Sequence, residues 1–214
     1  MSNRGRRQVT PVRIRRGRNW GLITLVAAVV VAAVGIIGFG GWAVHQNGRS
    51  WEDRAADIDG LVNYRKKSPK ALEYDKHTRG PLTYTMSPAV GGRHNNDWQN
   101  CMGDIYDAPI ANEHAVHSLE HGAVWVTYKQ GLPADQVDKL KSKVEGKDFI
   151  LMSPVANLDK NVSLQAWGYQ LKLDTVDDPR IDDFISALRT NASVEPGAPC
   201  SGGLTITGDT PQDS

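Results

Sequence analysis

The chain has 214 residues, with 25 basic and 24 acidic side chains and a formal net charge of +1. This length suits one modest domain with appendages. The charges are segregated, because seven arginines and no acid occupy the first 18 residues, which leaves 18 basic and 24 acidic residues in the rest. A basic tail in front of an acidic body excludes an ordinary nucleic-acid-binding domain, so we expect no nucleic acid among the partners.

Residues 20–44 contain no charged side chain and predict a transmembrane helix, since about 20 apolar residues span a bilayer. Trp20 and Trp42 lie near its two ends, where interfacial indoles are enriched. A cleaved signal peptide is the alternative, but it has a shorter apolar core and a small-residue cleavage site. The arginines predict that residues 1–19 are a cytoplasmic tail of a single-pass plasma-membrane protein, with the bilayer as a partner and the body extracytoplasmic.

The segment after the membrane divides into two parts. Residues 45–72 are charged, with a thin apolar stripe, and predict a juxtamembrane helical stalk. Residues 73–100 are irregular and rich in turn residues. They contain His77 and His94, and His94 follows two glycines that allow close approach of the backbone. Irregular segments of this length in a compact domain usually line a site or wrap the core.

Residues 113–128 hold three of the six histidines, at positions 114, 117 and 121. Steps of three and four return side chains to one face of a helix, so the pattern predicts a short helix with these imidazoles in one stripe and Glu120 beside them. Gly122 is typical of a helix C-cap. Alternating apolar residues then predict a strand over residues 123–128, with Val124 and Val126 on one face and Trp125 on the other.

The remaining elements predict an α+β domain over residues 73–203. They are, in order, an amphipathic helix over 133–144, an apolar strand over 148–153, a strand around 165–171 and a second amphipathic helix opened by 177–179. This order favours a small mixed-sheet sandwich covered by two helices. Residues 204–214 are expected to be a disordered polar tail.

Cys101 and Cys200 are the only cysteines. Outside the membrane, two cysteines most simply form one disulfide. The bridge closes a loop of about 100 residues, worth up to ~4.7 kcal/mol on the chain-entropy view. It ties the C-terminal end of the domain to the histidine region.

A metal site is the first candidate function. His117 and His121 are four positions apart, the spacing at which two imidazoles on a helix share one ion. His94, Glu120 or His114 could complete a site for zinc or copper. The alternative is a non-catalytic cell-envelope interaction domain, with an envelope protein as partner, whose histidines and Glu120 only brace a loop.

A metallohydrolase is the third candidate. Residues 117–121 fit the HxxEH pattern of inverted zinc peptidases, in which the glutamate is the general base. That mechanism needs a long catalytic helix and a distant acidic ligand, whereas Gly122 and a strand follow at once. The pattern therefore leaves open whether the protein is an enzyme.

Several motifs resemble a known family, the domain of unknown function 3105. They are residues 87–94, 98–101, 106–109, 115–128 and 195–203, and the similarity runs from about residue 73 to residue 203. The residues that match recurring family positions are His94, His117, Glu120, His121 and Gly122, with Cys101 and Cys200 matching a cysteine pair of its actinobacterial branch. The resemblance implies a bacterial, membrane-anchored, extracytoplasmic α+β domain with a His/Glu constellation, and it implies no reaction. His114 lies outside the family pattern, which places it beside the ligands or at the surface.

Overall fold

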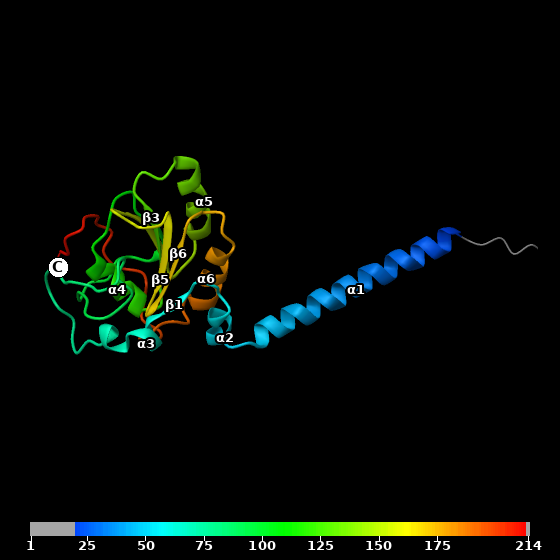
Figure 1. The fold of residues 1–214 in the computed structure, drawn as a ribbon, viewed down its shortest axis with the longest axis horizontal. Helices are drawn as coiled ribbons and strands as arrows, with labels where there is room; N and C mark the ends of the chain where they lie inside the picture. The colour runs from blue at the N-terminus through cyan, green and yellow to red at the C-terminus, as the bar shows by residue number, and fades with distance from the viewer. Residues whose placement is uncertain (1–19, 213–214) are drawn as a thin grey trace, which may run out of the picture. The chain divides into compact units, whose positions relative to one another are not determined.

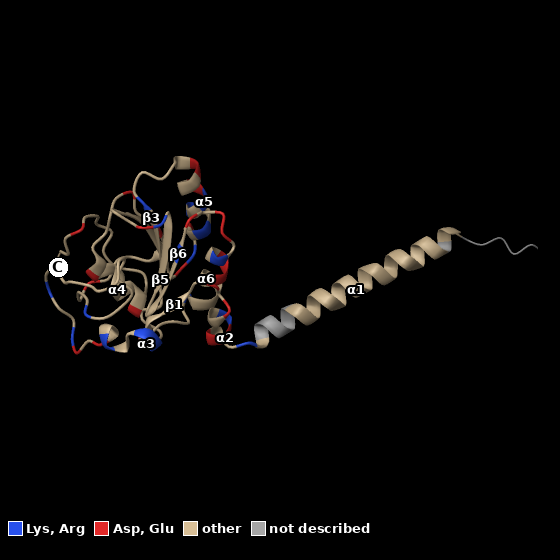
Figure 2. Ribbon diagram, viewed as in Figure 1, with Lys and Arg blue, Asp and Glu red and all other residues tan. Residues whose placement is uncertain are grey.

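The structure is a computed structural model, and it describes residues 20–212 in two units that divide between Gly48 and Arg49. The first unit contains α1 (Trp20–Gly48), in which residues Ile23–Trp42 have a mean hydropathy of 2.6 and are long enough to cross a membrane. In Figure 2 the part of α1 that is drawn in colour carries no Lys, Arg, Asp or Glu. The helix is a candidate membrane anchor, and a signal sequence has the same properties. The predicted cytoplasmic tail, residues 1–19, lies outside the described residues.

The second unit is built on a six-stranded mixed sheet. Figure 1 shows helices on both sides of the sheet. The strands, in the order β1-β6-β5-β3-β4-β2, are β1 (Val62–Asn63), β6 (Tyr169–Leu173), β5 (Val162–Ala166), β3 (Val124–Lys129), β4 (Ile150–Val155) and β2 (Met102–Ile105). The parallel pairs are β3 with β4 and β2 with β4, and the other neighbours are antiparallel. The predicted α+β class with a mixed sheet is confirmed.

One face of the sheet is covered by α5 (Ala134–Val144), α6 (Arg180–Leu188) and the short α2 (Trp51–Ala56). Val124 and Val126 of β3 lie in one buried apolar cluster with Leu140 of α5 and Phe184 of α6. The apolar residues of α6 recur with helical spacing, which places them on the side that meets the sheet. This face is the conventional core that the two amphipathic patterns predict.

The opposite face is covered by α4 (Asn112–Glu120) and by irregular chain (Figure 1). Trp125 of β3 and Leu151 of β4 point to this face and pack with Val116 and Leu119 of α4. The alternation along β3 is therefore as predicted, because neighbouring side chains of a strand point to opposite faces. The candidate site lies on this second face.

The predicted stalk is wrong, because residues 49–72 belong to the folded unit. Trp51 packs edge-on against Tyr169 with ring centroids 6.0 Å apart, and β1 pairs with β6. Short α3 (Tyr64–Lys67) and the 3-10 helix η1 (Pro69–Leu72) complete the segment. The thin apolar stripe faces the domain, because Ile58 is buried in the apolar cluster of the sheet and Leu61 packs against that cluster.

Two further elements differ from the prediction. The single strand expected around residues 165–171 is a hairpin of β5 and β6, with Gly168 at φ 78° in its turn. The tail predicted to be disordered is held against the domain as far as residue 212. The Leu204 amide donates to the Trp98 carbonyl at 2.8 Å, and the Gly208 amide donates to the Pro109 carbonyl at 2.6 Å.

Cys101 and Cys200 form a disulfide, as predicted, with their Cα atoms 5.0 Å apart. Both residues are buried in the cluster that contains Trp125 and α4. The bridge therefore fixes the C-terminal segment over the face of the sheet that carries the histidines.

Candidate metal centre

Helix α4 ends at a fixed point, and this end positions the central carboxylate. The amide of Ala123 donates to the Ser118 carbonyl and the amide of Gly122 donates to the Leu119 carbonyl, both at 3.0 Å. These two bonds form a Schellman motif, in which the residue after the helix adopts positive φ. Gly122 has φ 105°, and a Cβ atom there would lie 3.2 Å from Thr190 Cα. Glu120 and His121 are therefore held on a helical end that cannot extend.

Three imidazoles are oriented by backbone carbonyls. The Nδ1 atoms of His94, His117 and His121 lie 2.7, 2.8 and 2.7 Å from the carbonyl oxygens of Gly92, Asn95 and Pro199. A carbonyl only accepts, so each Nδ1 carries the hydrogen and each neutral ring keeps a lone pair on Nε2. Metal-binding histidines are commonly oriented in this way, with the second nitrogen bonded to a carbonyl or carboxylate.

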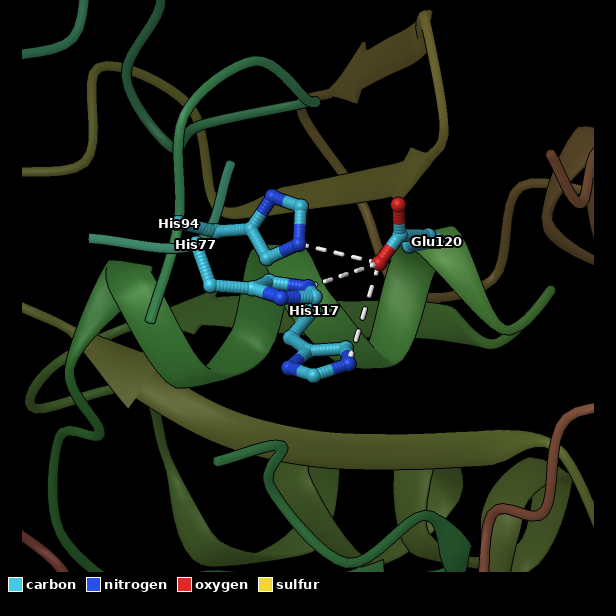
Figure 3. Close-up of side chains that lie close together, drawn as sticks. All are labelled: His77, His94, His117 and Glu120. Carbon is cyan, nitrogen blue, oxygen red and sulfur yellow. Dashed lines mark hydrogen bonds and ion pairs between the residues drawn. The ribbon is translucent and has the colours of Figure 1, made fainter. Parts of the chain in front are cut away.

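The Nε2 atoms of His77, His94 and His117 surround one carboxylate oxygen, Oε2 of Glu120 (Figure 3). It lies 2.9 Å from Nε2 of His94, 3.5 Å from Nε2 of His77 and 3.7 Å from Nε2 of His117. The other oxygen, Oε1, accepts a hydrogen bond from the Tyr74 hydroxyl. His117 and Glu120 come from α4, whereas His77 and His94 come from the irregular segment that covers it (Figure 3).

Burial sets the charge of this cluster. Burial, with a smaller contribution from the neighbouring imidazoles, lowers the pKa of His94 to about 4 and that of His117 to about 3. Burial, with a smaller contribution from the charge of Glu195, raises the pKa of Glu120 to about 7. A lone pair facing a carboxylate oxygen at 2.9 Å needs a cation between them. With a pKa of about 7, Glu120 is about half protonated near neutral pH in metal-free protein, and a proton on Oε2 would be donated to Nε2 of His94.

The donor atoms form two overlapping groups. Nitrogen or oxygen atoms of His77, His94, His117 and Glu120 all lie within 4.8 Å of one another, and so do those of His117, Glu120, His121 and Glu195. Zinc–ligand bonds of about 2.0–2.1 Å place tetrahedral donors about 3.4 Å apart, so small side-chain movements would complete either group.

Aromatic rings enclose the imidazoles. Trp167 meets His94 edge-on at 5.7 Å between centroids, and Trp98 packs on His121 at 5.1 Å. Such an apolar wall limits water and strengthens electrostatic interactions inside the cluster. The side chains of His77 and Glu195 are 37% and 59% exposed, so the cluster reaches solvent at both ends.

The predicted ligands His94, His117, Glu120 and His121 lie in this one cluster. His94 and His121 belong to different groups, however, so the three predicted imidazoles do not all belong to one group.

Sequence reasoning did not assign His77 or Glu195 to the site. His77 stands alone in an irregular stretch and gives no spacing signal. Glu195 lies five residues before Cys200, so the predicted disulfide was a signal that could have found it.

His114 is a separate case within the same helix. Its Nδ1 donates to the Asp97 carbonyl at 2.6 Å, and its Nε2 accepts from the Gln212 amide at 3.0 Å. Both ring nitrogens are therefore used by backbone groups, and His114 belongs to neither donor group. This histidine holds the C-terminal segment, in agreement with its place outside the family pattern.

The fold and the site define a class: an α+β domain with one mixed sheet and a buried His/Glu cluster on one of its faces. The family described as "Protein of unknown function (DUF3105)" matches residues 75–202, more than half of the chain, and the chain belongs to this family. The resemblance read from the motifs is thus confirmed. Comparison with curated proteins found no match, and comparison with solved structures found none either. The matched range encloses every donor residue of both groups.

Proposed function

We propose that the domain binds a divalent transition metal ion through His77, His94, His117 and Glu120. The observation that carries the proposal is the convergence of three imidazole Nε2 atoms on one buried carboxylate oxygen. Both donor groups consist of nitrogen and oxygen atoms, which suit zinc or copper(II) better than copper(I). Zinc is the first ion to test, with copper(II) as the second.

His114 is an internal comparison for the alternative, in which the histidines only brace the fold of an envelope interaction domain. A bracing histidine uses both nitrogens for ordinary hydrogen bonds, as His114 does. His94 instead directs its second nitrogen at a carboxylate, and His117 lies within 3.7 Å of the same oxygen. This difference on one helix and its covering loop favours ligation over bracing. Under the alternative, the domain would bind another envelope protein as its partner.

A metallohydrolase remains the third proposal. In the HxxEH pattern the glutamate acts as general base, whereas Glu120 here lies inside the donor group with one oxygen bonded to Tyr74. Its position supports the role of a ligand. Hydrolysis would need a coordination position open to water, and the half-exposed His77 marks the place where water can enter.

Calorimetric titration of the full chain in detergent micelles with zinc, and then with copper(II), tests metal binding. Wild type should bind with definite stoichiometry, His94→Ala should remove the ion held by the first group, and His117→Ala should weaken its binding. His114→Ala is the matched control on the same helix and should keep wild-type zinc binding. A flat wild-type titration with both metals would overturn the proposal, and equal binding by His94→Ala would exclude this ligand set.

We also propose that α1 anchors the protein in the plasma membrane with the domain outside the cell. The charge difference between the arginine-rich tail and the acidic body supports this orientation. Alkaline phosphatase fused after Ser214 should be active, because the enzyme folds correctly only after export. A stably expressed but inactive fusion would reverse the orientation.

A further inference from the structure

We infer that the His/Glu cluster holds a second metal ion, bridged to the first by the carboxylate of Glu120. This inference rests on the proposed metal function and extends it. The second ion would lie on the side of Glu120 that faces His121 and Glu195, whose Nε2 and Oε2 atoms are 3.6 Å apart. The ligand is thus a second divalent transition metal ion, with zinc as the probe.

The number of donors exceeds what one ion uses. The two overlapping groups comprise the imidazoles of His77, His94, His117 and His121 and the carboxylates of Glu120 and Glu195. A protein-bound zinc ion takes four ligands in most structural sites and three plus water in catalytic sites. Donors from six residues, all linked through shared members, therefore exceed one ion's requirement and match two.

The shared residues determine how the ions divide the ligands. Nδ1 of His117 is bonded to the Asn95 carbonyl, so only its Nε2 is free and it can ligate one ion at a time. Glu120 has two oxygens and can bridge. Without His117, the first ion keeps His77, His94 and Glu120, and the second keeps Glu120, His121 and Glu195. Each ion thus has at least three protein ligands, and the ion that binds His117 has four.

The backbone around Glu195 is fixed for this role. The amides of Val194 and Glu195 and the hydroxyl of Ser193 all donate to the main-chain carbonyl of Glu120, at 3.1, 3.3 and 2.9 Å. An exposed glutamate on a free loop would have no such anchoring. Here the main chain of Glu195 is hydrogen-bonded to the main chain of Glu120, which carries the bridging carboxylate.

The same segment also orients the other ligand of the second ion. Pro199 accepts the hydrogen bond from Nδ1 of His121 at 2.7 Å, and the next residue, Cys200, is bonded to Cys101. The segment between Ser193 and Cys200 thus supplies one ligand and orients another.

Two divalent ions outweigh the charge of two carboxylates, so the pair would take an anionic oxygen ligand, hydroxide in the first instance. Paired ions about 3.5–4 Å apart that share a carboxylate and keep open positions are the arrangement used by two-metal hydrolytic sites. Three protein ligands at each ion would leave such positions. The proposed class of centre is a carboxylate-bridged dinuclear site with solvent access at Glu195.

The test counts zinc per chain in the full-length protein in detergent micelles, by elemental mass spectrometry after gel filtration at saturating zinc. Wild type should hold two zinc ions per chain, and X-ray absorption should show zinc–zinc scattering at about 3.5–4 Å. Glu195→Gln should hold one and lose that scattering. Glu145→Gln is the matched control, because it makes the same charge change at the exposed end of α5 on the opposite face, and it should keep two.

Each result decides between the proposals. One zinc in both wild type and Glu195→Gln would overturn the second ion while leaving the first. Two zinc ions in Glu195→Gln, with the scattering retained, would also overturn it. No zinc in wild type would overturn the metal function as a whole. Equal melting temperatures of Glu195→Gln and Glu145→Gln would show that a lost ion reflects the ligand and not unfolding.

Discussion

The two faces of the sheet are built on different principles. On one face, α5 and α6 are amphipathic helices that bury an apolar stripe and leave charged residues in water (Figure 2). On the other face, α4 is almost entirely buried, including its glutamates and histidines. The first face uses regular helices to form a core, whereas the second uses irregular chain to satisfy buried polar groups.

This difference separates stability from function. A buried imidazole or carboxylate costs free energy unless it has a partner. On the α4 face, the partners are backbone carbonyls of loops and the donors of the cluster itself. A disulfide holds the segment that supplies several of these contacts. We therefore expect changes on the α5 and α6 face to affect folding alone, and changes on the α4 face to affect metal affinity first.

The largest effect is expected from Phe184→Ala on the apolar face. Phe184 is fully buried between α6 and the sheet, and the cavity left behind should cost about 3–5 kcal/mol of unfolding free energy. Denaturant unfolding measures the loss. Zinc per folded chain should stay at the wild-type value. A parallel loss of zinc would show that the two faces are not separable.

Replacing both cysteines, Cys101→Ser with Cys200→Ser, should cost about 2–5 kcal/mol and also weaken zinc binding. The second effect is expected because the bridge holds Pro199 and Glu195 near His121. Denaturant unfolding and zinc titration measure the two effects. Non-reducing peptide mapping of protein from the envelope should show the bridge, and two alkylatable thiols there would contradict this account. Unchanged zinc affinity in the double variant would mean that the bridge stabilises the fold alone.

Tyr74→Phe should lower zinc affinity about 10–100-fold with little change in stability, because the lost hydroxyl orients Oε1 of Glu120. Calorimetry measures the affinity. Tyr64→Phe is the control, since the Tyr64 hydroxyl bonds to Gln170 away from the cluster. Equal affinities of the two variants would show that Tyr74 has no role in orienting the ligand.

Zinc affinity should fall about tenfold per pH unit as pH drops below 7, since the metal needs the Glu120 carboxylate and its pKa is about 7. With the unperturbed histidine pKa, zinc affinity would be lost as the pH falls through about 6.5. The pKa values of His94 and His117 are instead lowered to about 4 and 3. Those rings therefore compete with metal only in more acidic solution. Titrations at pH 5–8 measure the slope. Glu120→Gln should bind zinc more weakly and show no such slope between pH 6 and 7. A slope retained in this variant would mean that a group other than Glu120 takes up the proton.

The regular half of the fold was predictable from the sequence. The spacing of apolar residues predicted α5 and α6, and the handover from histidine helix to strand at Gly122 predicted α4 and β3. The disulfide followed from the number of cysteines and from the expected location of the domain outside the membrane. These predictions succeed because each depends on local periodicity or on a count, both of which are visible along the chain.

The irregular half was not predictable in the same way. The turn at Gly168, the docking of Trp51 and the positions of His77 and Glu195 depend on contacts between distant segments. None of these residues lies in a repeating pattern, so the sequence alone does not indicate where each of them lies. The sequence predicted the donors that lie on or next to helix α4, because their spacing is regular. It did not predict His77 and Glu195, because these two residues lie on loops.

The donors are distributed over almost the whole matched domain, with His77 near its beginning and Glu195 near its end. During synthesis, the last donor joins the chain only after every strand and helix of the domain has been made. A truncated or partly folded chain therefore lacks the complete cluster, whatever its content of regular structure. Occupancy of both proposed sites would thus require the completed domain, whereas the donors of the first group are all present once residue 120 has been added.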